Sequence, residues 1–188
     1  VCPAPTIRSR MNLTETKKSR EQLVDGVLLK VYRDTVALPD GSESVREWID
    51  HPGASAVVPL FPDGSTLLVR QFRYPPQREF LEVPAGKLDH DGEDPAEVAR
   101  RELEEEVGYT ADTLTHVAST YPCIGYSNEV IHLFLAEDLR RQVAHLQGGA
   151  AARGIRCRHV VAAVEQVVVH AVGRVSGEAL VDPAAAAL

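Results

Sequence analysis

Short runs of apolar and β-branched residues, separated by turn residues, recur along most of the chain, and this pattern is typical of β-strands. The expected strands are residues 26–38, 44–49, 54–60, 65–72, 80–83, 114–120 and 130–136. The turn Pro62-Asp63-Gly64 lies between two of the apolar runs, so it predicts a hairpin that joins residues 54–60 to residues 65–72. Many strands and few helices indicate the α+β class with a mixed sheet.

One segment has the periodicity of an amphipathic helix. Asp94 is a good N-cap, Pro95 fits the first helical position, Glu97 completes a capping box and Gly108 supplies the C-terminal stop. At about 100° per residue, one apolar face forms that we expect to pack on a sheet. That face consists of Ala96, Ala99, Leu103 and Val107. A second helix is expected over residues 164–172.

Length and charge restrict the class of protein. The chain has 188 residues, of which 44% are hydrophobic and 25% charged, so we expect one folded domain with room for an extension. The net charge of −7 argues against nucleic acid as a partner. The apolar runs are too short to cross a membrane. The three cysteines are too scattered for a disulfide framework or a zinc cage, so we expect a cytoplasmic protein.

The ends of the chain differ from its middle. Residues 1–10 precede Met11, the single methionine, and have no periodicity, so we expect a disordered or artefactual leader. Residues 11–52 are expected to form an N-terminal β-sheet segment, and residues 53–188 the main domain, with an atypical part at 139–188.

Three glutamates of the expected helix, Glu102, Glu105 and Glu106, fall within about 100° of one another beside its apolar face. They repel one another by roughly 0.2–0.5 kcal/mol per pair, and the helix C-terminus also disfavours negative charge. A solvated acidic helix face is one interpretation. The other follows from Glu106, which is expected to be partly buried and therefore to need a partner. Grouped carboxylates suit Mg²⁺ or Mn²⁺.

The spacing around these glutamates resembles the Nudix box, the loop–helix signature of the Nudix hydrolase family. The matching pattern is Gly86-x6-Glu93-x7-Arg101-Glu102-Leu103-x-Glu105-Glu106-x-Gly108-Tyr109, whose first gap is six residues where the family usually has five. Residues 82–89 and 125–129 also look like the ADP-ribose pyrophosphatase branch, and the resemblance covers roughly residues 20–138. It implies an α/β/α sandwich with a mixed sheet, plus a small N-terminal antiparallel sheet.

The resemblance also implies an activity and its machinery. Nudix enzymes use divalent ions to hydrolyse a nucleoside diphosphate linked to another moiety. The implied metal ligands are the carbonyl of Ala85 and the carboxylates of Glu102, Glu105 and Glu106. Arg101 would pair with Glu93 and orient the glutamates, which is also reasonable because a planar guanidinium holds a carboxylate well.

The implied substrate contacts are Arg46, Glu47, Arg73, Lys87, Gly125 and Glu129. The partner would be a small nucleotide, and the family's N-terminal sheet implies a homodimer. In relatives specific for ADP-ribose a proline usually precedes the glycine at position 125, whereas this chain has Ile124.

The C-terminal third departs from the family pattern. Residues 139–164 contain five arginines but no acid, although the family usually places its general base here. The next acid, Glu165, is the candidate base. The tail is either divergent or the product of a reading-frame error.

The leading hypothesis is therefore metal-dependent hydrolysis of ADP-ribose or a related sugar nucleotide to AMP (or another nucleoside monophosphate) and a sugar phosphate. The alternatives are a Nudix hydrolase specific for another sugar nucleotide and a catalytically silent nucleotide-sensing module.

Overall fold

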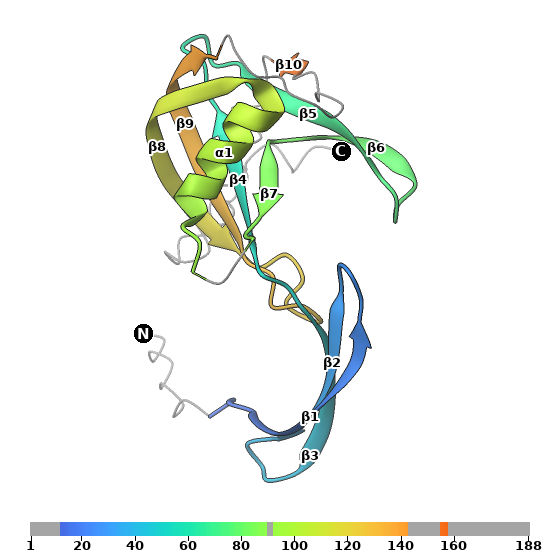
Figure 1. Cartoon of the computed structure of the whole chain (residues 1–188). Helices are drawn as coiled ribbons and strands as arrows, with labels where there is room; N and C mark the ends of the chain where they lie inside the picture. The colour runs from blue at the N-terminus through green and yellow to red at the C-terminus, as the bar shows by residue number, and fades with distance from the viewer. Residues whose placement is uncertain (1–11, 90–91, 143–154, 158–188) are drawn as a thin grey trace, which may run out of the picture. The chain divides into compact units, whose positions relative to one another are not determined.

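The computed structural model describes residues 12–89, 92–142 and 155–157 (Figure 1). The chain forms two compact units. One contains the described residues up to His51 together with Cys123–Asn128, and the other contains those of Pro52–Pro122 and from Glu129 onward.

The first unit is built on a three-stranded antiparallel sheet. Its strands are β1 (Thr16–Asp25), β2 (Lys30–Ala37) and β3 (Glu43–Asp50), in the order β1-β2-β3. The small N-terminal antiparallel sheet is thus confirmed. The sequence did not predict β1, because all ten of its residues are exposed and it has no apolar alternation.

A polar cluster joins the three strands of this sheet. Asp34 on β2 is buried and accepts two hydrogen bonds of 2.8 Å from Arg20 on β1. The indole N–H of Trp48 on β3 donates to the same carboxylate at 3.1 Å. These charge-assisted hydrogen bonds hold the pKa of Asp34 below its usual value. Cross-strand hydrogen bonding therefore stabilises a sheet that buries little apolar surface.

The second unit contains a four-stranded mixed sheet in the order β7-β4-β9-β8. Its central strands, β4 (Ala54–Pro59) and β9 (Ile131–Arg141), pair in parallel. The outer strands, β7 (Ala85–Lys87) and β8 (Tyr109–Thr120), are antiparallel to their neighbours. The predicted strands 114–120 and 130–136 are confirmed but extend further than expected. Residues 85–87, which lie outside the strands expected from the sequence, form the short strand β7.

A second sheet in this unit has the order β10-β5-β6. It consists of β5 (Thr66–Arg73), β6 (Arg78–Glu82) and β10 (Ile155–Cys157). The predicted hairpin between 54–60 and 65–72 is wrong, because the described strands β4 and β5 belong to different sheets, and only an isolated bridge joins Leu60, just after β4, to Thr66. The turn does form, with Gly64 at φ 75°. However, β7 and β9 occupy both hydrogen-bonding edges of β4, so β5 diverges and pairs with β6.

Helix α1 (Pro95–Val107) covers one face of the four-stranded sheet (Figure 1). It begins as predicted, with the Asp94 carboxylate accepting from the N–H of Ala96 at 2.9 Å, and it ends at Gly108 with φ 74°. The predicted apolar face is confirmed. The core beneath it consists of Val57, Ala99, Leu103, Phe134 and Ala136, with Ala96 and Val107 packed against it.

The α+β class with a mixed sheet is therefore confirmed. The expected helix over residues 164–172 lies outside the described residues. Within the described part of the chain, no helix is both long and apolar enough to cross a membrane.

Candidate active site

The site is built where the last turns of α1 face the strands β7 and β5. Glu106 is half-buried there, as the sequence predicted, and two elements hold its carboxylate. One oxygen accepts from the backbone N–H of Ala85 on β7, and the other from the side-chain amide of Gln71 on β5, each at 3.1 Å. Burial nevertheless raises the pKa of Glu106 above its usual value. The site thus holds negative charge that these donors only partly compensate.

Glu102 lies one turn earlier on α1 and contacts β7 even more closely. A Cβ atom at Gly86 would lie 2.0 Å from its Oε1 and 2.4 Å from its Cδ, so only glycine leaves room for this carboxylate. Its side chain is 15% exposed. Burial first, and then the charges of Glu106 and Glu105, raise the pKa of Glu102. The Gly86–Glu102 contact gives a packing reason for the glycine of the sequence pattern.

The predicted pair between Arg101 and Glu93 is present. Arg101 Nη1 donates to Glu93 Oε1 at 2.7 Å, and Arg101 Nη2 donates to Asp89 Oδ2 at 3.2 Å. The second oxygen of Glu93 accepts from the backbone N–H of Asp89 at 2.7 Å. Arg101 Nε also approaches Glu102 Oε1 at 3.9 Å. The arginine therefore ties the loop before the helix to the turn that carries Glu102.

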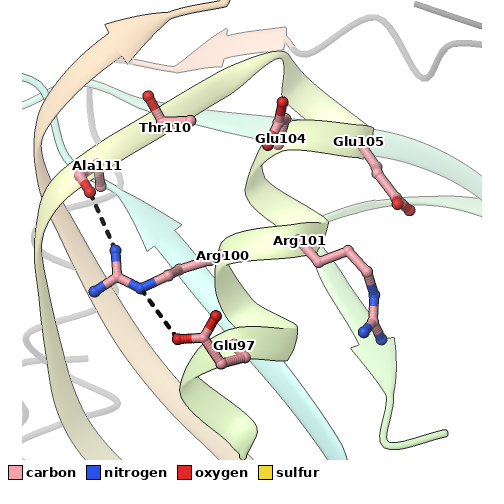
Figure 2. Close-up of a pocket in the computed structure, with 7 residues that line it drawn as sticks. All are labelled: Glu97, Arg100, Arg101, Glu104, Glu105, Thr110 and Ala111. Carbon is pink, nitrogen blue, oxygen red and sulfur yellow. Dashed lines mark hydrogen bonds and ion pairs between the residues drawn. The ribbon is translucent and has the colours of Figure 1, made fainter. Parts of the chain in front are cut away.

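Glu105 is exposed and lines an open groove of about 600 Å³ along the outer side of α1 (Figure 2). Figure 2 shows Glu105 and Arg101 extending on the same side of the helix, whereas Arg100 donates to the carbonyl of Ala111 at 3.2 Å and pairs with Glu97. Glu105 is therefore the most solvent-accessible of the three carboxylates that are predicted metal ligands.

The chemistry of these residues fits a hard divalent cation. Among the described residues, no three acidic, histidine or cysteine side chains already stand in a metal-binding arrangement. Two half-buried carboxylates, Glu102 and Glu106, nevertheless lie beside the Ala85–Gly86 backbone with partly uncompensated charge. Oxygen donors of this kind are those that Mg²⁺ and Mn²⁺ prefer.

Three of the predicted substrate residues, Arg73, Lys87 and Glu129, belong to the second unit. Arg73 on β5 forms hydrogen bonds of 2.8 and 2.5 Å to both oxygens of Glu82 on β6, and the charge of Glu106 also acts on it. Lys87 ends β7 and is exposed, while Glu129 is half-buried before β9. The structure thus brings Arg73 close to the glutamate site.

The other predicted substrate residues belong to the first unit. On β3, Arg46 pairs with Glu15, and Glu47 accepts from Arg33 at 2.7 Å. Gly125 lies in the loop that this unit includes, and it is exposed. Glu165, the candidate base, lies outside the described residues.

Sequence reasoning missed two contacts of the site. Gln71 and Glu82 were not singled out as site residues, although both bind predicted ones. Gln71 and Arg73 are two positions apart on β5 and so share one face of the strand. Because Arg73 was already a predicted substrate residue, its position on the same strand face was the signal that could have identified Gln71.

Comparison with known proteins agrees with this geometry. A family model described as NUDIX domain matches residues 50–171. The chain is 44% identical over 128 residues to the ADP-ribose pyrophosphatase of Bacillus subtilis (strain 168), covering 68% of this chain and 69% of that protein. It is 38% identical over 122 residues to the ADP-ribose pyrophosphatase of Mycobacterium tuberculosis (strain ATCC 25618 / H37Rv), covering 65% and 59%.

Two further similarities widen the comparison. The GDP-mannose pyrophosphatase of Yersinia enterocolitica (serotype O:8 / biotype 1B, strain NCTC 13174 / 8081) is 35% identical over 130 residues, covering 63% of this chain and 66% of that protein. A solved structure described as an ADP compounds hydrolase superimposes with a TM-score of 0.69 at 23% identity, covering 88% of this chain and 91% of that one, and it supports the fold.

The chain belongs to the NUDIX family, and the resemblance read from its loop–helix spacing is confirmed. Its matched segment spans 59–69% of the length of the three relatives named here.

Proposed function

We propose that the protein is a Nudix pyrophosphatase that hydrolyses the pyrophosphate bond of ADP-ribose or a related nucleoside diphosphate sugar. The products would be AMP, or another nucleoside monophosphate, and a sugar phosphate. The observation that carries the proposal is the pair of half-buried carboxylates, Glu102 and Glu106, held against the Ala85–Gly86 backbone. Two relatives named as ADP-ribose pyrophosphatases support the choice of substrate class.

The residues proposed to hold Mg²⁺, or Mn²⁺, are the carbonyl of Ala85 and the carboxylates of Glu102, Glu105 and Glu106. A bound divalent ion supplies neutralisation of the diphosphate charge and a lowered pKa for its bound water. The protein's own contribution is to keep three carboxylates close together despite their repulsion. Arg101 supports this by pairing with Glu93 and approaching Glu102, which fixes the helix against the preceding loop.

The remaining site residues would bind and orient the substrate. The guanidinium of Arg73 is preorganised by its two hydrogen bonds to Glu82 and can reach a phosphate from the same strand end. We assign Glu129 to the terminal ribose and Arg46 and Glu47 to the base, and we propose that Lys87 and Gly125 also bind the substrate. Glu165 is the proposed general base, because residues 139–164 contain no acid.

A hydrolase for another sugar nucleotide is the second candidate. It is favoured by the 35% identity to a GDP-mannose pyrophosphatase and by Ile124, which stands where ADP-ribose-specific relatives usually have proline. A catalytically silent nucleotide-sensing module is the third possibility, and the lack of acid in residues 139–164 is its basis. We also propose a cytoplasmic homodimer with a small nucleotide as its partner.

One assay separates these candidates. The purified protein is incubated with ADP-ribose, GDP-mannose and other sugar nucleotides, with and without Mg²⁺, and release of nucleoside monophosphate is measured. The proposal expects Mg²⁺-dependent release of AMP from ADP-ribose, which Glu106→Gln abolishes without loss of the fold. Preferred release of GMP from GDP-mannose would support the second candidate. Nucleotide binding without any turnover would refute the hydrolase and favour the sensor.

A further inference from the structure

We infer that Gln71 is a positioning residue that orients the Glu106 carboxylate for cation binding. The inference rests on the proposed function, because it takes Glu106 to be a metal ligand. Gln71 lies on β5, which belongs to a different sheet from β7. In the sequence, Gln71 and Glu106 are 35 positions apart. Its amide N–H donates to Glu106 Oε1 at 3.1 Å.

The two donors to Glu106 come from different elements and bind different oxygens. Ala85 donates its backbone N–H to Oε2, so β7 fixes one end of the carboxylate. Gln71 fixes the other end from β5. Within the described residues, these two N–H groups are the hydrogen-bond donors to this carboxylate. Two anchored oxygens define the plane of the carboxylate, whereas one would leave it free to rotate about its last bond.

The chemistry of the amide suits this role. A neutral amide donates a hydrogen bond without cancelling the negative charge that attracts a cation. A lysine or arginine at position 71 would compete with the metal for the same carboxylate, and a glutamate would add a further repelling charge. Gln71 is half-buried, so its hydrogen bond is partly shielded from water.

Hydrogen-bond partners of metal-ligating groups typically change metal affinity or activity by about 10–100-fold when they are removed. We therefore expect Gln71→Met, which keeps the length of the side chain but lacks the donor, to weaken Mn²⁺ binding by about this factor. Gln77→Met is the matched control. Gln77 lies in the turn of the same β5–β6 hairpin and also donates one side-chain hydrogen bond, to the carbonyl of Tyr74.

The test measures Mn²⁺ binding in the absence of nucleotide, by calorimetry or by the electron paramagnetic resonance of free Mn²⁺. The proteins are the full chain, Glu106→Gln, Gln71→Met and Gln77→Met. Kinetics then provide a second measurement. The Mg²⁺ concentration for half-maximal activity should rise in Gln71→Met by the same factor as the dissociation constant, and saturating Mg²⁺ should restore kcat. A merely structural role for Gln71 would lower the melting temperature and leave the metal requirement unchanged.

The outcomes separate the inference from the function on which it depends. If the unmodified protein binds no Mn²⁺, or if Glu106→Gln binds it equally well, the metal role of Glu106 is refuted, and the inference falls with it. If binding depends on Glu106 but a folded Gln71→Met binds Mn²⁺ as tightly as the unmodified protein, only the role of Gln71 is refuted. Should Gln71→Met not fold, Gln71→Asn decides instead, because it keeps the amide but is one methylene too short, and unchanged Mn²⁺ affinity would then refute the inference.

Discussion

At the level of single residues, the buried charges of Glu102 and Glu106 lower the stability of the folded protein. Both carboxylates are half-buried, and burial is the main reason that their pKa values are raised. In Glu102 the neighbouring charges of Glu106 and Glu105 add to this effect. A raised carboxyl pKa means that the folded state holds its proton more tightly than the unfolded state. The charged site is therefore less favourable to folding at neutral pH than at acidic pH.

From this we predict that Glu102→Gln stabilises the metal-free protein. A glutamine of similar shape removes the charge, so the melting temperature in EDTA should rise. The rise should be larger at pH 8 than at pH 4.5, because the Glu102 carboxylate is fully charged only at pH values above its raised pKa. Activity should fall by more than the roughly 10–100-fold effect that is typical of residues beside a metal ligand.

Glu104→Gln is the control for this prediction, because Glu104 is exposed on the same helix. It should change neither the pH dependence of the melting temperature nor the activity. Equal shifts in both variants would mean that the effect comes from the overall charge of α1 and not from the buried position of Glu102.

Gly86 provides the second prediction at the residue scale. A methyl group there would lie 2.0 Å from Glu102 Oε1, so Gly86→Ala must displace the end of a flexible side chain. We expect a small loss of stability, about 1 kcal/mol or less, because the carboxylate can move away. The loss of activity should be large, because the moved group is a proposed ligand.

A double-mutant cycle checks the cause of this loss. In a Glu102→Ala background the space beside Gly86 is free, so adding Gly86→Ala should have no further effect on the unfolding free energy. Denaturant unfolding of the four proteins measures the coupling. If Gly86→Ala is equally destabilising in both backgrounds, the strain lies in the backbone of β7 and not in the contact with Glu102.

At the scale of elements, the features that the sequence predicted correctly are those set by local signals. Asp94, Pro95 and Gly108 mark the ends of α1 within a few positions, and 3.6-residue periodicity marks its buried face. Strand pairing is a non-local property. The turn around Gly64 was found, but nothing local shows that β7 and β9 fill both edges of β4.

The same distinction holds for the site. Glu93, Arg101 and the three glutamates lie within one short stretch, so their spacing could be read directly. The contact of Gln71 with Glu106 joins residues 35 positions apart and depends on how α1 packs against β5, so sequence reasoning did not find it. The sequence also did not predict β1, because its ten exposed residues give no alternation of apolar and polar positions.

The N-cap of α1 provides a prediction at the element scale. Asp94→Ala removes the carboxylate that accepts from the N–H of Ala96, so the free energy of unfolding should fall by about 1 kcal/mol. Asp94→Asn keeps a capping oxygen and should retain most of the stability. Urea unfolding with matched m-values measures both. Equal losses in the two variants would show that the charge near the helix N-terminus matters more than the cap itself.

At the scale of the whole molecule, the first unit presents more exposed apolar surface than a small sheet usually tolerates. Of the residues in β1, β2 and β3, only Asp34 and Val36 are buried. The β1–β2 hairpin also exposes a run of large apolar side chains around its turn. These are Leu23, Val24, Val27, Leu28 and Leu29. A three-stranded sheet generally needs a covered apolar face to be stable in water.

We therefore predict that the homodimer implied by the family resemblance forms through this unit and stabilises it. Light scattering should give a mass near 41 kDa, twice the 20.5 kDa of the chain. The melting temperature should rise with protein concentration, since association stabilises the folded state by mass action. Leu28→Asp, which places a charge on the exposed hairpin, should shift the protein towards the monomer and lower that melting temperature.

Leu13→Asp, at an exposed apolar residue before β1, is the control and should leave both the mass and the melting temperature unchanged. A monomeric mass at every concentration, with a melting temperature independent of concentration, would contradict the dimer. A dimer unaffected by Leu28→Asp would instead place its interface away from the β1–β2 turn.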